Sequence, residues 1–161
     1  MSQFSIDLSA QIAKIKGNID AASRQAVTDV AARIVERSPV GDAKLWKEKP
    51  PKGYVGGRFK ANWQIGESAV PQGTFDAIDP SGGASMQRIR AAIPIQAGGK
   101  MYYLANNLPY AQRLEDGWST QTPAGMVALT VAEWKNIVDD AVNNARNANS
   151  SMTAGFEAYP I

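Results

Sequence analysis

The sequence contains neither cysteine nor histidine. The absence of cysteine excludes disulfides, thiol nucleophiles and thiolate metal sites, and the absence of histidine removes the commonest general base and metal ligand. No window approaches the roughly 18 uncharged apolar residues of a membrane-spanning helix. The stretch from Met1 to Asp7 lacks the basic and apolar regions of a secretory signal. These absences exclude much enzymology, and they predict synthesis in the cytoplasm, no cofactor and no membrane partner.

The length and composition fit one ordinary globular domain. The chain has 161 residues, of which 44% are hydrophobic, enough to bury a real core. Its net charge of +2 is unevenly distributed, because residues 1–60 carry 11 Lys and Arg against 6 Asp and Glu, whereas residues 61–161 carry 6 against 9. This asymmetry is compatible with a nucleic-acid face, with a head-to-tail contact between subunits, or with a solvated surface that binds nothing.

The carboxylates form no catalytic or metal-binding pattern. Glu115 and Asp116 are adjacent, so their side chains diverge by about 100° on a helix and cannot share a proton. Asp76 and Asp79 lie in a loop without further ligand spacing, which is a weak cation signal. The two Gly-Gly pairs lack the context of a nucleotide-binding loop. We therefore predict a protein that is not an enzyme and has no metal site; the enzymatic alternative is a glycosidase that uses carboxylates alone, because such an enzyme needs neither histidine nor cysteine.

A long amphipathic helix is predicted over residues 5–37. Apolar residues recur every three or four positions, and Ser38-Pro39 ends the pattern because proline disfavours a helical residue before it. A domain of this size cannot cover the whole apolar stripe of such a long helix. Part of the stripe is therefore expected to pack on another subunit. The stripe comprises Leu8, Ile12, Ile15, Ile19, Ala22, Ala26, Val30 and Ile34.

Residues 39–57 form a loop rich in glycine and proline, and its central part alternates cations with aromatic residues. Basic and aromatic side chains suit phosphate contact and base stacking, but they equally suit docking on another protein through an anchoring tryptophan. A third interpretation is that the aromatics cover the edge of the sheet. We favour protein contact. The side chains concerned are Lys44, Trp46, Lys47, Lys49, Lys52 and Tyr54.

At least three antiparallel strands are predicted in the middle of the chain. Alternating apolar residues indicate strands over 59–65 and 89–95, separated by a polar loop at 66–85. The pair Gly98-Gly99 predicts a hairpin turn leading into a strand over 101–106. Both faces of this last strand are bulky, so it is expected to be covered on two sides, with one cover supplied by a second copy of the chain.

The last third of the chain is predicted to be helical. Residues 109–116 form a short helix ended by Gly117, and Thr130 with Glu133 resembles a capping box at the start of a second helix. Pro123-Ala124-Gly125 is also compatible with a start one or two turns earlier. Its inward side chains would be Trp134, Ile137, Val138, Ala141, Val142 and Ala145. The overall prediction is one α+β domain over 1–147, in which a long N-terminal helix and a C-terminal helix pack on a small antiparallel sheet with long loops, followed by a polar tail at 148–161.

Two segments carry a resemblance to a known family. The first is Ser38-Pro39-Val40-Gly41-Asp42 followed, after an apparent insertion, by Gly57-Arg58-Phe59 and Trp63. The second is Asn106, Tyr110-Ala111, Leu114-Glu115 and Gly117, followed by Ala124-Gly125-Met126-Val127. In this order, behind a long first helix, they resemble the neck or tail-completion proteins of long-tailed bacteriophages.

The resemblance implies a virion structural protein that forms a ring, expected to be sixfold, at the junction of head and tail. Its partners would be the head connector or adaptor proteins and the tail terminator or tail tube proteins, and DNA would pass through the ring without its sequence being read. The alternatives are a tail terminator or connector adaptor, or a nucleic-acid-binding module that uses the basic 44–54 loop. The predicted interface residues are Trp46, Tyr54, Arg58, Trp63, Tyr102, Tyr110, Arg113, Glu115 and Trp118.

Overall fold

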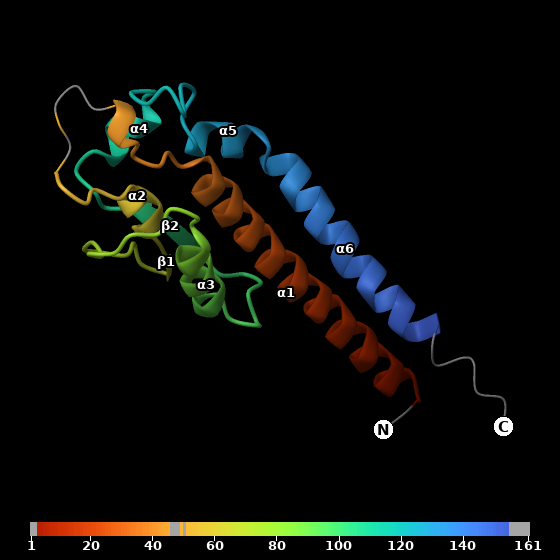
Figure 1. The fold of residues 1–161 in the computed structure, drawn as a ribbon. Helices are drawn as coiled ribbons and strands as arrows, with labels where there is room; N and C mark the ends of the chain where they lie inside the picture. The colour runs from red at the N-terminus through yellow and green to blue at the C-terminus, as the bar shows by residue number, and fades with distance from the viewer. Residues whose placement is uncertain (1–2, 46–48, 50, 155–161) are drawn as a thin grey trace.

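The structure is a computed structural model that describes residues 3–45, 49 and 51–154 (Figure 1). Two long helices, one at each end of the chain, run side by side away from a smaller body that contains the strands and the short helices. The elements follow in the order α1 (Gln3–Arg37), the 3₁₀ turn η1 (Ala43–Leu45), α2 (Arg58–Ala61), β1 (Trp63–Glu67), α3 (Gly83–Ala92), β2 (Tyr102–Asn106), α4 (Ala111–Glu115), α5 (Val127–Ala132) and α6 (Trp134–Ala154).

The predicted α+β class is confirmed, with a small antiparallel sheet between helices. Helix α1 ends at Arg37, as the Ser38-Pro39 pair predicts, and its C-terminal half contributes Ala31, Ile34 and Val35 to the core. The same core receives β1, α3 and the segment that begins α5. No helix among the described residues is long and apolar enough to cross a membrane.

Within the described residues the sheet has two strands, because two of the predicted strand segments are partly helical. Strands β1 and β2 pair antiparallel, with Trp63 opposite Asn106 and Glu67 opposite Tyr102. The prediction of a strand over 59–65 is wrong for its first half, where α2 buries Phe59 and Ala61. Gly57 precedes this turn of helix with a φ of 114°, a conformation that glycine adopts without a steric penalty.

The predicted strand over 89–95 is wrong, and helix α3 occupies most of it. Met86, Ile89 and Ile93 are buried at spacings of three and four, which fits one face of a helix. The even spacing of Ile89 and Ile93 also fits one face of a strand. Asp79 decides between them by capping α3, since its carboxylate accepts hydrogen bonds from the backbone N–H groups of Gly82 and Ser85, both at 2.9 Å. The Gly98-Gly99 turn is present, but it connects α3 to β2 and is not a hairpin turn.

The end of the chain also differs from expectation. Thr130 does not cap a helix, because it lies inside α5 and its hydroxyl donates to the Met126 carbonyl oxygen at 2.8 Å. Trp134 begins α6 and is 52% exposed, so the prediction that it points inward is wrong. Helix α6 continues to Ala154, beyond the start predicted for the tail at 148. Residues 155–161 lie outside the described part of the chain.

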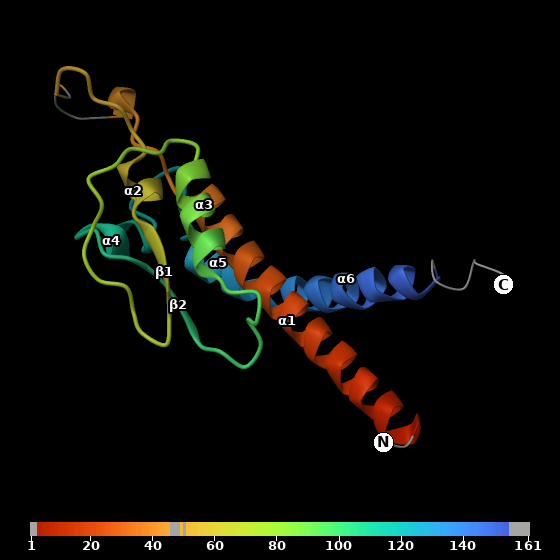
Figure 2. The same ribbon diagram turned by 90° about the horizontal axis from the view of Figure 1, so that it is seen from below.

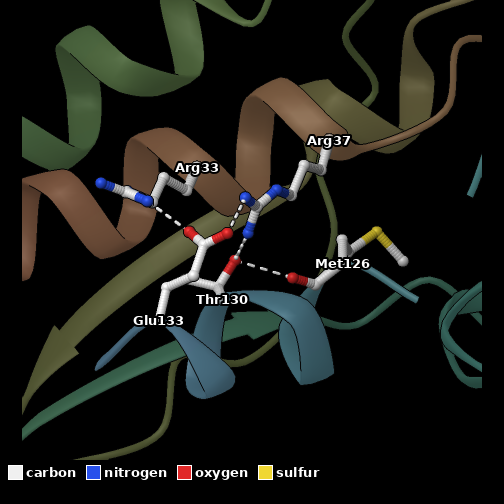
Figure 3. Close-up of polar contacts among 5 residues, drawn as sticks. All are labelled: Arg33, Arg37, Met126, Thr130 and Glu133. Carbon is white, nitrogen blue, oxygen red and sulfur yellow. Dashed lines mark hydrogen bonds and ion pairs between the residues drawn. The ribbon is translucent and has the colours of Figure 1, made fainter. Parts of the chain in front are cut away.

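Helix α6 packs along α1 in two ways. Ala26 of α1 is buried with Ile137 and Ala141 of α6 in a small apolar cluster. Further along, Glu133 binds two guanidinium groups of α1: Arg37 at 2.7 Å, and Arg33 (Figure 3). These ion pairs join the C-terminal part of α1 to the junction of α5 and α6. Seen from below, the N-terminal part of α1 diverges from α6 (Figure 2).

Candidate partner interface

The two halves of the first family-like segment meet in the core. The indole N–H of Trp63 donates to the Ser38 hydroxyl at 2.7 Å, and that hydroxyl donates to the Ile34 carbonyl oxygen at 2.8 Å. Trp63 is only 5% exposed and meets Phe59 edge to face, with 5.8 Å between ring centroids. The prediction of Trp63 as an interface residue is therefore wrong: it holds β1 against the end of α1.

Glu115 joins the two parts of the second family-like segment. Its carboxylate accepts hydrogen bonds from three consecutive backbone N–H groups at the start of α5: Met126 at 3.0 Å, Val127 at 3.0 Å and Ala128 at 2.8 Å. Burial alone would raise the pKa of Glu115, but these bonds outweigh it and hold the pKa below its ordinary value. Glu115 thus holds the local geometry of its own chain, and its place at a partner interface stays a prediction.

Two glycines of this segment are required by close backbone approaches. A Cβ on Gly125, where φ is 74°, would lie 2.6 Å from both the carbonyl oxygen and a carboxylate oxygen of Glu115. A Cβ on Gly117, where φ is 83°, would lie 2.5 Å from the Pro123 carbonyl oxygen. Gly117 also follows the end of α4, as predicted from the sequence. The residues that carry the resemblance are therefore parts of one local structure.

An open groove of about 960 Å³ lies beside this structure. Its walls are formed by residues 39–42 and 51–57, by α2, by the 76–78 loop and by the region around α4, at the end of the molecule farthest from the start of α1 (Figure 1). Four of the predicted interface residues line it, and the rest of its surface is largely apolar. Its walls include Val40, Tyr54, Arg58, Phe59, Ile78, Tyr110, Leu114 and Trp118.

The exposed rim of this groove carries an arginine and a tryptophan in contact. Trp118 is 72% exposed, and the guanidinium carbon of Arg113 lies 4.5 Å from the centroid of its ring. A cation–π contact at an exposed site contributes about 0.5–1 kcal/mol of attraction. Tyr110 lies nearby against Phe59, and burial raises the pKa of its hydroxyl, an effect that the Arg58 cation partly offsets. Aromatic and arginine side chains of this kind are enriched at protein interfaces.

The remaining predicted residues lie elsewhere. Tyr102 is on β2 at the far end of the sheet, where its half-buried hydroxyl donates to the Ala97 carbonyl oxygen at 3.4 Å. Trp46 falls outside the described residues.

Asp79 serves as the cap of α3. Burial would raise its pKa, but hydrogen bonds from Ser85, Ser81 and Gly82 outweigh that effect and lower the pKa. Within the described ranges there is no cluster of three or more acidic side chains that could hold a metal ion.

Sequence reasoning missed two features of the surface. Ile78 lies in the predicted loop at 66–85, yet it forms part of the groove wall and is largely exposed. Leu129, Val131 and Trp134 are also exposed, around the junction of α5 and α6. A single isoleucine in a loop gives no periodicity, so only the fold identifies its role. Comparison with protein-family models, with curated proteins and with solved structures gave no match to this chain.

Proposed function

We propose that this protein is a non-enzymatic virion component that forms a ring at the head–tail junction of a long-tailed bacteriophage. Copies of the chain would surround the DNA channel, with the head connector or adaptor on one side and the tail terminator or tail tube on the other. The DNA would pass through without base contacts. The groove would be the surface that binds a segment of a protein in a neighbouring ring.

The observation that carries this proposal is the groove itself. It is open, largely apolar, and bordered by Tyr110, Arg58 and the stacked pair of Arg113 and Trp118. Residues of these types dominate the binding energy of protein interfaces. The groove is also held by the local structure that Glu115 organises, so the segments resembling the phage family and the candidate interface occupy the same region.

The overall shape also supports a ring. A cyclic assembly needs two different patches on each subunit, because each copy contacts its neighbours through opposite sides. The groove is assigned to a neighbouring ring, so contacts between copies within the ring need other surfaces. The exposed apolar residues of α1 lie toward the opposite end of the molecule from the groove and are candidates for such a contact (Figure 1). The uneven charge of the two parts of the sequence remains compatible with such a contact.

Replacing Trp118 by alanine is expected to weaken docking by about 2 kcal/mol, roughly 30-fold, because an exposed aromatic side chain at a groove rim anchors a partner. The melting temperature should change little, since the side chain is mostly in water. The measurement is the yield of joined particles when the variant complements a phage that lacks this chain. Ile95→Ala is the matched control, because Ile95 is 76% exposed and is not among the residues that line the groove.

The nucleic-acid alternative predicts a different result from the same protein. In that case Lys44→Gln, Lys49→Gln and Lys52→Gln together would reduce binding to double-stranded DNA, with a steep dependence on salt. We expect no such binding near physiological ionic strength. Salt-dependent DNA binding that the lysine changes abolish, together with full particle yield for Trp118→Ala, would refute the proposed function.

A further inference from the structure

The N-terminal part of α1 forms an arm that the described remainder of the chain, up to residue 154, leaves uncovered. Every residue from position 8 to position 17 is exposed, and this part of the helix diverges from α6 (Figure 2). A short helix without tertiary contacts is marginal in water. The arm therefore needs a surface to pack against if it is to stay helical.

One face of the arm is a row of large aliphatic side chains, here called the aliphatic face. Leu8, Ile12, Ile15 and Ile19 are each 45–55% exposed and follow one another at spacings of four, three and four. The row continues the face on which Ala26 is buried against α6. At about 100° per residue the whole row stays within one narrow sector of the helix. The α1–α6 contact thus ends while the apolar face of α1 continues.

The opposite face of the arm, here called the small face, lacks large side chains. Ala10, Ala13, Gly17 and Ala21 are exposed and lie roughly 180° around the helix from the aliphatic face. Gly17 is unexplained within one chain, because a Cβ there would meet no atom within 4 Å and glycine destabilises a helix interior relative to alanine. A glycine in this setting is accounted for if another backbone approaches closely.

We propose that the aliphatic face of one copy packs on the small face of α1 in the next copy. Large side chains then fill the shallow surface above Gly17, as ridges fill grooves between packed helices. Because the two faces are different and belong to every copy, the contact is heterologous and passes from each copy to the next, and within the proposed ring the rotation between neighbours closes it. This contact lies within the proposed ring, and its biological role therefore rests on the proposed function.

A second copy fits the arm better than other occupants because the arm supplies both complementary surfaces. The flanks of the aliphatic face carry Ser9, Gln11 and Asn18, which are uncharged, and Lys16 alone adds a charge there. Lys14 borders the small face. Identical arms therefore meet without a row of opposed like charges. Pairing of two aliphatic faces would stop at a dimer and would leave Gly17 unexplained.

The test uses the full-length chain and its lack of cysteine. Ile15→Cys and Gly17→Cys proteins are purified separately, mixed at high concentration and oxidised. The proposal predicts that the mixed disulfide forms at least about ten times faster than either homodimer, because positions 15 and 17 face each other only across the heterologous contact. Equal rates for all three products, or a preference for the Ile15→Cys homodimer, would overturn it.

Non-covalent variants give an independent readout by sedimentation or native mass spectrometry. Ile15→Asp removes the aliphatic face and Gly17→Leu blocks the small face, so each alone is expected to weaken self-association at least about 100-fold. Mixed together, they should form a 1:1 heterodimer, since each retains the face that the other has lost. Gln11→Asp, one turn away on the flank, is the charge-matched control and should associate normally. A dimer of Gly17→Leu alone would indicate aliphatic-face pairing and overturn the proposal.

Failure here is separable from failure of the proposed function. If the disulfide test fails while Trp118→Ala still blocks joining of particles, the arm contact is wrong and the head–tail role stands. If the arms pair as proposed while particles assemble normally with Trp118→Ala, the copies associate but the groove is not the joining surface.

Discussion

Glu115→Ala is expected to lower the free energy of unfolding by about 3 kcal/mol. The substitution leaves three backbone N–H groups at the start of α5 without their charged acceptor, and hydrogen bonds to charged groups are among the stronger ones. For a chain of this length the melting temperature should fall by roughly 6–12 °C. Urea unfolding followed by circular dichroism measures the change. Asp116→Ala is the control, because that exposed neighbour bonds only Gln112 among the described contacts.

The same carboxylate predicts a pH dependence. The pKa of Glu115 is lower in the folded protein than its unfolded value near 4.5, so its stabilisation is present above pH 4.5 and is lost as the pH falls through the folded pKa. Asp79 contributes in the same direction, because its pKa is also lowered. The wild-type protein should therefore lose more stability between pH 5 and pH 3 than Glu115→Ala does. Parallel losses in the two proteins would show that Glu115 is not the group concerned.

Gly57→Ala is expected to destabilise the fold by more than about 3 kcal/mol and to prevent accumulation of soluble protein. The φ of Gly57 is 114°, and an added Cβ would lie 2.5 Å from the backbone nitrogen of Pro80, which cannot rotate away. Gly53→Ala is the matched control. Its φ is also positive, at 78°, but a Cβ there meets no atom within 4 Å, so only about 1 kcal/mol of backbone strain is expected. Equal effects of the two changes on thermal unfolding would contradict the close approach.

The sequence predicts the fold best where a single residue imposes a boundary. Pro39 ends α1 and Gly117 follows α4, because each residue restricts or permits backbone conformations regardless of distant contacts. The helix-versus-strand choice for 83–95 could not be made in this way. Ile89 and Ile93 fit both periods, and the decisive group is Asp79, which caps α3 from a loop that has no periodicity.

The candidate interface was predictable in composition but not in geometry. Tyr110 and Trp118 were identified from residue type, and the fold brings them to one groove with Tyr54 and Arg58. Trp63 is of the same type, yet its indole is buried against Ser38. A tryptophan in a sequence is compatible with a core or with an interface. Only the position of the neighbouring chain segments decides between them.

The uncovered part of α1 was predictable because helix length and domain size are both visible in the sequence. A helix of 35 residues exceeds what the small body can cover, and the aliphatic residues before Ala22 are the exposed ones. The periodicity of the sequence does not identify the surface that packs against these residues. The small face opposite becomes informative only when the structure places no atom near Gly17.

The most direct test of the central claim is the number of copies of this chain in a purified virion. Quantitative mass spectrometry with isotope-labelled peptides gives this number relative to a tail tube protein of known stoichiometry. A ring at the head–tail junction predicts about six copies, or a small multiple of six, in every intact particle. One or two copies per particle, or the absence of the chain from particles that are fully joined, would contradict the account.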